Sequence, residues 1–246
     1  MSASDFMAGL EAWRKERLQI LEERKARLAG LPCKIPDSLY DPEDGLPRFP
    51  WAWYQGQLIV LRPVETDGMP NRFGGAHELA WQGPAKGCRP HLLLRLRPSS
   101  LPFGLPAMPA DDLPLFHPFR SSEGPELAYA PGPDGALIAS QSPRARRADR
   151  DYPYPDYPEV LPSRGLAIEG PHPVPYLALF PAGSHRTLSV QDLPEDGEQF
   201  LIVVVTAREK TLGVSLLGPE AEDNSVQVVF VVNPATSAVW TYNQCT

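Results

Sequence analysis

Hydrophobic residues concentrate in two runs near the carboxyl end of the chain. Residues 200–205 and 226–232 are almost entirely apolar, with Gln227 as the one polar residue in them. Because both runs are short and rich in valine, they are typical of β-strands that are covered on both faces, whereas a half-exposed strand alternates apolar and polar residues. We therefore expect the main core of the protein to form around these two strands.

Shorter hydrophobic runs predict further strands, separated by glycine, proline, asparagine and aspartate turns. In residues 91–97 the leucines 92, 94 and 96 alternate with Leu93, Arg95 and Arg97, which predicts one buried face. The repeat of roughly 8 to 12 residues per strand is typical of an antiparallel β-sandwich or a partly open barrel. The predicted strands are 51–54, 57–62, 77–81, 91–97, 126–129, 136–139, 166–169, 176–180, 185–190, 199–206, 211–217, 226–232 and 238–242.

Residues 5–29 predict one amphipathic α-helix at the N-terminus. Ser4 is a suitable N-cap, and Gly30 followed by Pro32 ends the helix. The charged second half of the helix predicts an end that projects into solvent, and a helix that docks onto a partner protein is the alternative. Its apolar face consists of Phe6, Leu10, Trp13, Leu21 and Leu28.

Proline changes this picture more than any other residue. The chain holds 30 prolines in 246 residues, roughly twice the usual share. Because proline lacks an N–H donor and breaks helix interiors, we expect short elements joined by long proline-rich loops. The resulting prediction is a mainly β protein with an N-terminal helix over 1–30, a first β lobe over 31–142, an extended linker-like segment over 143–165 and a C-terminal β lobe over 166–246.

Net charge and cysteine content indicate which classes of partner and which cellular compartment are compatible with the chain. A formal net charge of −7 argues against nucleic acid or an anionic membrane as a partner. Cys33, Cys88 and Cys245 are too widely spaced for a disulfide framework, which favours a reducing compartment. The N-terminus lacks the features of a signal peptide, and no apolar run approaches the roughly 20 residues that span a bilayer. These features predict a cytoplasmic protein.

No motif specifies a cofactor, and the reactive residues have simpler explanations. Cys88 and His91 have the spacing of half a zinc site, but no second pair supplies the other ligands. Asp111 and Asp112 are expected to be solvated acids of a polar loop. We therefore expect no metal, no cofactor and no catalytic residue. A hydrolase that uses Ser215, in a segment resembling a nucleophile elbow, or His185 is the alternative.

Polar residues of the C-terminal β region supply the candidate ligand contacts. A strand that begins after the glycine turn at 183 directs His185 and Arg186 to opposite faces, and arginine binds carboxylates and phosphates bidentately. Tyr242 is a candidate stacking surface, and Asn233 lies close to it in sequence, although a turn explains this asparagine as well. These residues favour a non-enzymatic binding module that recognises a protein or a small acidic ligand through loops of the β body.

Two parts of the chain resemble one protein family. Residues 13–17 have the sequence W-R-K-E-R, which is similar to a W-R-x-E-R opening. Residues 195–202, then Asn233-Pro234, then Tyr242 to Cys245 follow the order of an EDGE-F-L-I strand, an N-P turn and a Y-x-x-C ending. On these motifs the chain resembles the bacterial proteins catalogued as domain of unknown function 1684. The resemblance implies a helix followed by a mainly β body, and it implies no activity.

Overall fold

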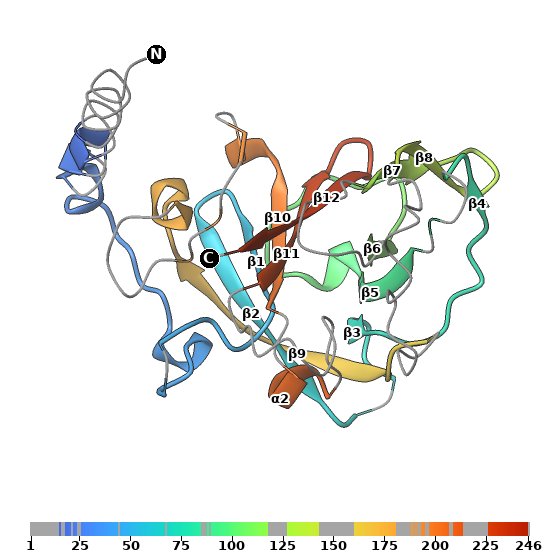
Figure 1. The fold of residues 1–246 in the computed structure, drawn as a ribbon, viewed down its shortest axis with the longest axis horizontal. Coiled ribbons are helices and arrows are strands. Elements are labelled where there is room, and N and C mark those ends of the chain that lie inside the picture. The colour runs from blue at the N-terminus through green and yellow to red at the C-terminus, as the bar shows by residue number, and fades with distance from the viewer. Residues whose placement is uncertain are drawn as a thin grey trace, which may run out of the picture.

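A computed structural model gives the fold of the chain (Figure 1). The structure describes Lys15 and residues 18–20, 22–23, 26–43, 45–66, 68–84, 88, 90–117, 127–142, 160–180, 188, 190, 193–194, 197–206, 209–213 and 226–245. The strands are β1 (Trp51–Tyr54), β2 (Gln57–Val64), β3 (Arg72–Phe73), β4 (Trp81–Gln82), β5 (His91–Leu96), β6 (Leu113–His117), β7 (Leu127–Pro131), β8 (Leu137–Gln141), β9 (Arg164–Pro173), β10 (Leu201–Thr206), β11 (Val226–Asn233) and β12 (Ala238–Cys245). The helical elements are α2 (Glu209–Leu212) and the 3-10 turns η1 (Asp37–Leu39), η2 (Pro98–Ser100), η3 (Tyr176–Leu179) and η4 (Gly197–Gln199).

All the described strands belong to one 12-stranded sheet, in the order β4-β8-β7-β12-β11-β10-β1-β2-β9-β3-β5-β6. Neighbouring strands are antiparallel except β4 and β8, which are parallel. The prediction of a mainly β protein is confirmed. The described strands form one large open sheet, so a sandwich of two separate sheets is not confirmed. Strands of the two predicted lobes alternate in it, since β1 and β2 lie between β10 and β9.

The two valine-rich strands lie in the middle of the sheet and are covered on both faces. Every residue of β10 is buried, and so are residues 227–232 of β11. Because side chains alternate across a strand, Val203 and Phe230 enter one core while Val204 and Val229 enter another on the opposite face. We call these the inner core and the outer core. The prediction of two-sided burial is confirmed.

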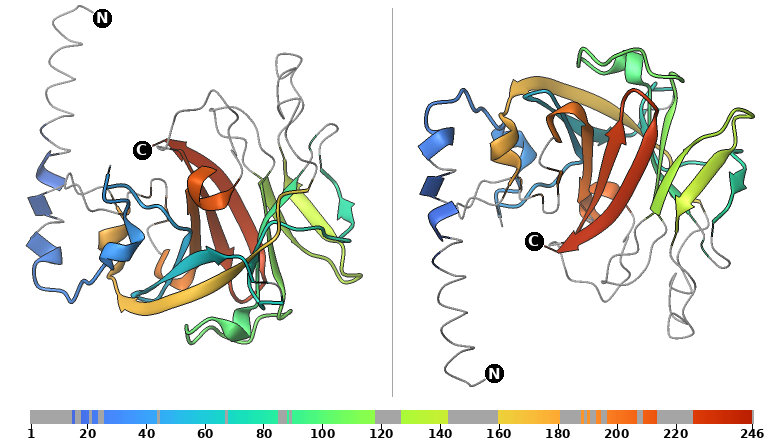
Figure 2. Two further views of the ribbon diagram at one scale, coloured as in Figure 1. Left: turned by 90° about the horizontal axis from the view of Figure 1, so that it is seen from below. Right: turned by 90° about the horizontal axis from the view of Figure 1, so that it is seen from above.

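The inner core is enclosed because the sheet curls until its β6 edge meets β7. Tyr129 of β7 makes the junction: its hydroxyl donates to the carbonyl of Pro114 at 2.8 Å and accepts from the N–H of Phe116 at 2.8 Å. The ring of Trp81 lies edge-on to Phe116 and Tyr129, with centroid distances of 5.1 and 5.2 Å. Figures 1 and 2 show β5 and β6 lying close to β7 and β12. Side chains rather than a backbone ladder therefore close this seam.

Irregular chain covers the outer core. The indole Nε1 of Trp53 donates to the carbonyl of Val174 at 2.7 Å, and its ring lies 5.2 Å from that of Tyr176. The 3-10 turn η3 replaces the strand predicted over 176–180. Tyr176 and Leu179 are both buried there, and a spacing of three matches the 3-10 period rather than the alternation of a strand.

Three other predicted strands differ from the structure, and two observed strands were not predicted. Only the last residue of 77–81 lies in a strand, in β4, and Thr211–Leu212 belong to α2 instead of a strand. Leu188 and Val190 lie outside the named strands, and the rest of 185–190 is outside the described residues. The two strands that the hydrophobic pattern did not predict are β3 and β6. Pro114 is compatible with that strand because β6 lies at the edge of the sheet, where a missing N–H is tolerated.

The predicted N-terminal helix falls mostly outside the described residues. Residues 18–20, 22–23 and 26–28 are helical. Leu28 packs against the outer core, whereas Leu18 is 62% exposed. The full predicted span, 5–29, stays a prediction, as does the predicted linker, whose residues 143–159 are not described. Among the described residues, no helix is both long enough and apolar enough to cross a membrane.

Candidate functional site

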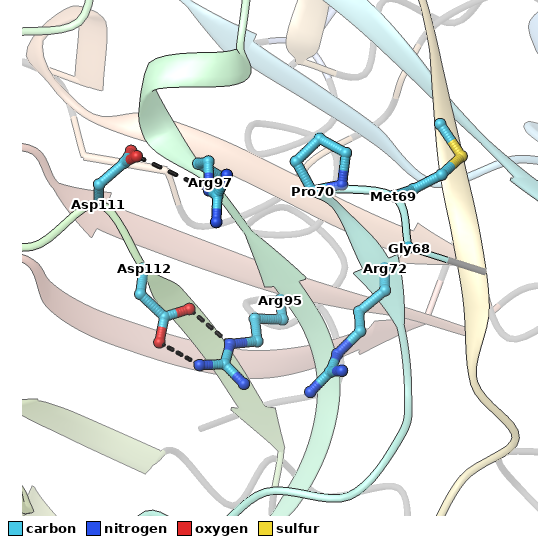
Figure 3. Close-up of a pocket in the computed structure, with 8 residues that line it drawn as sticks. All are labelled: Gly68, Met69, Pro70, Arg72, Arg95, Arg97, Asp111 and Asp112. Atoms are coloured by element: carbon cyan, nitrogen blue, oxygen red, sulfur yellow. Dashed lines mark hydrogen bonds and ion pairs between the residues drawn. The ribbon is translucent and has the colours of Figure 1, made fainter.

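A pocket of about 450 Å³ opens beside β3 and β5 (Figure 3). Its volume falls in the range of small-molecule sites, which is roughly 300–1,000 Å³. Three arginines and two aspartates dominate it, so its formal charge is +1. The pocket is lined by Gly68, Met69, Pro70, Arg72, Arg95, Arg97, Asp111 and Asp112.

The pairing of β3 with β5 places the three arginines of the pocket on the same face of the sheet. Arg72 of β3 and Arg95 of β5 are directly opposite each other in the antiparallel ladder, and Phe73 is opposite Leu94 in the inner core. Arg97 follows Arg95 by two positions, so alternation directs both to the face opposite that core. Figure 3 shows the side chains of Arg72 and Arg95 extending side by side from the two paired strands.

Arg95 is held by Asp112 in a two-bond pair. Nε donates to Oδ1 and Nη2 donates to Oδ2, both at 2.6 Å. The hydrogen bonds that Arg95 donates to Asp112 raise the pKa of Arg95, so its guanidinium stays protonated. The two side chains are 36% and 37% exposed. At this exposure such a pair contributes at most about 1 kcal/mol to stability, so it orients the guanidinium more than it stabilises the fold.

Asp111 fixes the rim of the pocket next to Arg97. Its carboxylate accepts from the backbone N–H of Ser99 at 2.8 Å and from the Ser99 hydroxyl at 2.6 Å. These two bonds, the hydroxyl bond first, lower the pKa of Asp111, and the charge of Arg97 adds to the effect. Nε of Arg97 lies 3.7 Å from Asp111, a loose ion pair.

Buried Asn71 supports the same rim from below. Its Oδ1 accepts from the N–H of Arg97 at 2.7 Å, and its Nδ2 donates to the hydroxyl of Ser100 at 2.8 Å. The backbone that carries Arg97 and the η2 turn is therefore fixed by side chains on both sides.

Arg72 differs from the other two arginines. Its Nη2 donates to the carbonyl of Ala76 at 3.0 Å. Its Nε is buried and meets no acceptor in the part of the chain that the structure describes. Among the ion pairs of described residues, none engages Arg72, whereas Arg95 and Arg97 each have an aspartate. Arg72 is thus a cation beside another cation, with a neutral carbonyl as its partner.

The structure describes two of the four predicted site residues, Tyr242 and Asn233. His185 and Arg186 lie outside the described residues, as does Ser215. Tyr242 is 5% exposed and lies 4.6 Å from the ring of Trp240, so its ring packs on the outer core. Asn233 ends β11, where its Oδ1 accepts from the N–H of Ala235 at 2.9 Å in the turn to β12.

The metal and hydrolase alternatives gain no support from the described residues. Cys88 forms no disulfide with any described cysteine, and the described residues contain no group of three or more His, Cys, Asp or Glu side chains placed to hold a metal. The pocket lining offers cations and paired aspartates. It contains no serine, cysteine or histidine among its described residues.

The sequence contained part of the signal for the pocket. The alternation in residues 91–97 predicted one buried face, and Leu92, Leu94 and Leu96 are buried as predicted. Leu93, which the alternation grouped with Arg95 and Arg97, is buried in the same core. Arg72 was missed because β3 is two residues long and has no pattern of its own. Asp112 was expected to be solvated because nothing local in the sequence links it to Arg95.

A second polar group lies inside the sheet, around His117. This residue is 1% exposed at the end of β6 and is directly opposite His91 of β5. Burial lowers the pKa of His117 to about 3; a hydrogen bond with Asn243 opposes this shift, and the electrostatic effect of His91 adds to it. The imidazole is therefore neutral in the folded protein at physiological pH.

We expect the free energy of unfolding to fall as the pH is lowered from about 6.5 to 5. The unfolded chain protonates His117 near its ordinary pKa of 6.5, whereas the folded chain does not, so protons favour unfolding. One such group gives a slope of up to about 1.4 kcal/mol per pH unit. Urea unfolding across this range should show a smaller slope for His117→Gln than for the wild type. Equal slopes would contradict a buried neutral His117.

Comparisons with known proteins assign no family to the chain: no family model matches it, and neither a curated protein nor a solved structure matches it. The resemblance to domain of unknown function 1684 stays a prediction.

Proposed function

We propose that this protein is a non-enzymatic binding module for a small acidic ligand, which it holds between Arg72 and Arg95. The observation that carries this proposal is the direct opposition of two arginines on neighbouring strands. Like charges placed opposite each other destabilise a sheet. Asp112 offsets the charge of Arg95 on one side. A bound anion between the two guanidinium groups would offset the charge that remains.

The hydrogen-bond donors suit an oxyanion. Asp112 occupies Nε and one proton of Nη2 of Arg95, which leaves the Nη1 edge for a ligand. Guanidinium groups bind carboxylates and phosphates in a planar, two-bond geometry. Met69 and Pro70 line the same pocket and provide apolar surface for the rest of a small molecule. The pocket volume favours a small ligand over a flat protein surface.

Replacing Arg72 by glutamine is expected to weaken anion binding about tenfold, the effect of losing one charge-assisted hydrogen-bonding group. Isothermal titration calorimetry with inorganic phosphate and with succinate, at low ionic strength, measures the change in dissociation constant. Arg27→Gln is the matched control because it removes the same charge from an exposed residue of the N-terminal helical turns. The proposal fails if the wild type binds neither anion, or if Arg72→Gln binds as well as Arg27→Gln.

A further inference from the structure

The pair between Arg95 and Asp112 has two opposite interpretations, if the proposed function holds. Asp112 would either compete with the ligand for Arg95, or hold Arg95 in the orientation that the ligand needs. The first interpretation predicts that loss of the carboxylate strengthens anion binding. The second predicts that it weakens binding, although the pocket becomes more positive.

The geometry favours the second interpretation. Asp112 binds the edge of the guanidinium formed by Nε and Nη2. The opposite edge, with Nη1, remains, and Figure 3 shows that side of the guanidinium facing Arg72. A ligand anion between the two arginines therefore does not need the edge that Asp112 occupies.

The backbone around Asp112 keeps the carboxylate in place. Asp112 directly precedes β6, and Leu113 at the start of that strand is directly opposite Leu96 of β5. Leu113 and Leu96 are both buried in the inner core. The residue that follows Asp112 is thereby tied to the strand that carries Arg95.

We infer that Asp112 is a positioning residue for the proposed site: it holds Arg95 so that its Nη1 edge and the guanidinium of Arg72 face one oxyanion of the ligand. The ligand class is then a molecule with one compact oxyanion, a carboxylate or a phosphate, rather than a chain of separated charges. An arginine without this carboxylate is free to rotate, and the ligand must order it on binding.

Two neighbouring aspartates make the test specific. Asp112→Asn and Asp111→Asn change the pocket charge equally, from +1 to +2, but only Asp112 is bonded to Arg95 among the contacts described above. Phosphate titrations should give a dissociation constant about fivefold higher for Asp112→Asn than for the wild type, the effect of ordering one long side chain. Asp111→Asn should bind phosphate more tightly than the wild type, because it removes a negative charge from the pocket and leaves the pair between Asp112 and Arg95 intact.

The orientation of Arg95 is measured separately from affinity. In ¹⁵N NMR spectra without phosphate, the Nε–Hε signal of Arg95 should be sharp and dispersed in the wild type and in Asp111→Asn. It should move toward the position of exposed arginines in Asp112→Asn, and Asp112→Glu should restore part of the dispersion. Tighter phosphate binding by Asp112→Asn, or an unchanged Arg95 signal in it, would overturn the inference. Absence of phosphate binding by the wild type would overturn the proposed function as well.

Discussion

Replacing Trp53 by alanine is expected to lower the free energy of unfolding by about 3–5 kcal/mol, the usual cost of removing a buried tryptophan side chain. Trp53 is fully buried in β1, and its ring packs in the outer core against Tyr176. The substitution also removes the donor to the carbonyl of Val174. Equilibrium unfolding in urea, followed by circular dichroism, measures the loss.

Two control variants separate packing from a general effect of substitution. Trp53→Phe keeps most of the apolar volume but leaves the carbonyl of Val174 without its donor, so we expect a loss of about 1–3 kcal/mol. Leu18→Ala removes an exposed side chain and should change stability by less than about 0.5 kcal/mol. If Trp53→Ala were as stable as Leu18→Ala, the outer core could not have the packing described.

Replacing Tyr129 by phenylalanine is expected to destabilise the protein by about 2–5 kcal/mol although it removes a single oxygen atom. That oxygen satisfies the N–H of Phe116 and the carbonyl of Pro114, both at the buried seam between β6 and β7. Leaving a buried backbone group unsatisfied costs about 1–3 kcal/mol, and here two groups lose their partner together. Urea unfolding measures the difference.

The matched control for this change is Tyr54→Phe. Tyr54 is also buried in the inner core, and its hydroxyl has no hydrogen bond to any residue that the structure describes. Its loss should therefore cost much less than the loss of the Tyr129 hydroxyl. Equal effects of the two substitutions would show that Tyr129 does not join the edge of β6 to β7. Faster hydrogen exchange of the Phe116 amide in Tyr129→Phe would confirm that it does.

The sequence predicted the parts of the fold whose signal is local. The valine-rich runs at 200–205 and 226–232 correspond to β10 and β11, and the alternation at 91–97 corresponds to β5. The order of strands was not predictable from such patterns, because it depends on pairings between distant residues. β1 pairs with β10 across about 150 residues of chain, and the hydrophobic periodicity of either segment carries no information about that pairing.

The candidate site also depends on strand pairing between segments that are distant in the sequence. The sequence pattern predicted one buried face for residues 91–97 and gave Arg95 and Arg97 no role, and the residues that make them a site come from elsewhere in the chain. β3 brings Arg72, and the segment before β6 brings Asp112. Both strands escaped prediction, since β3 is too short to show a pattern and Pro114 interrupts the apolar run of β6. The residues chosen from the sequence instead, Tyr242 and Asn233, have packing and turn contacts in the structure.

The most direct test of anion binding between Arg72 and Arg95 is a phosphate titration of the ¹⁵N-labelled protein, observed at the arginine Nε–Hε signals. Signals are assigned with single arginine-to-lysine variants. The structure predicts that the signals of Arg72 and Arg95 move together and follow one dissociation constant, while that of exposed Arg27 stays in place. Shifts of equal size in all three signals, or no shift of Arg72 and Arg95 at millimolar phosphate, would contradict the proposed site.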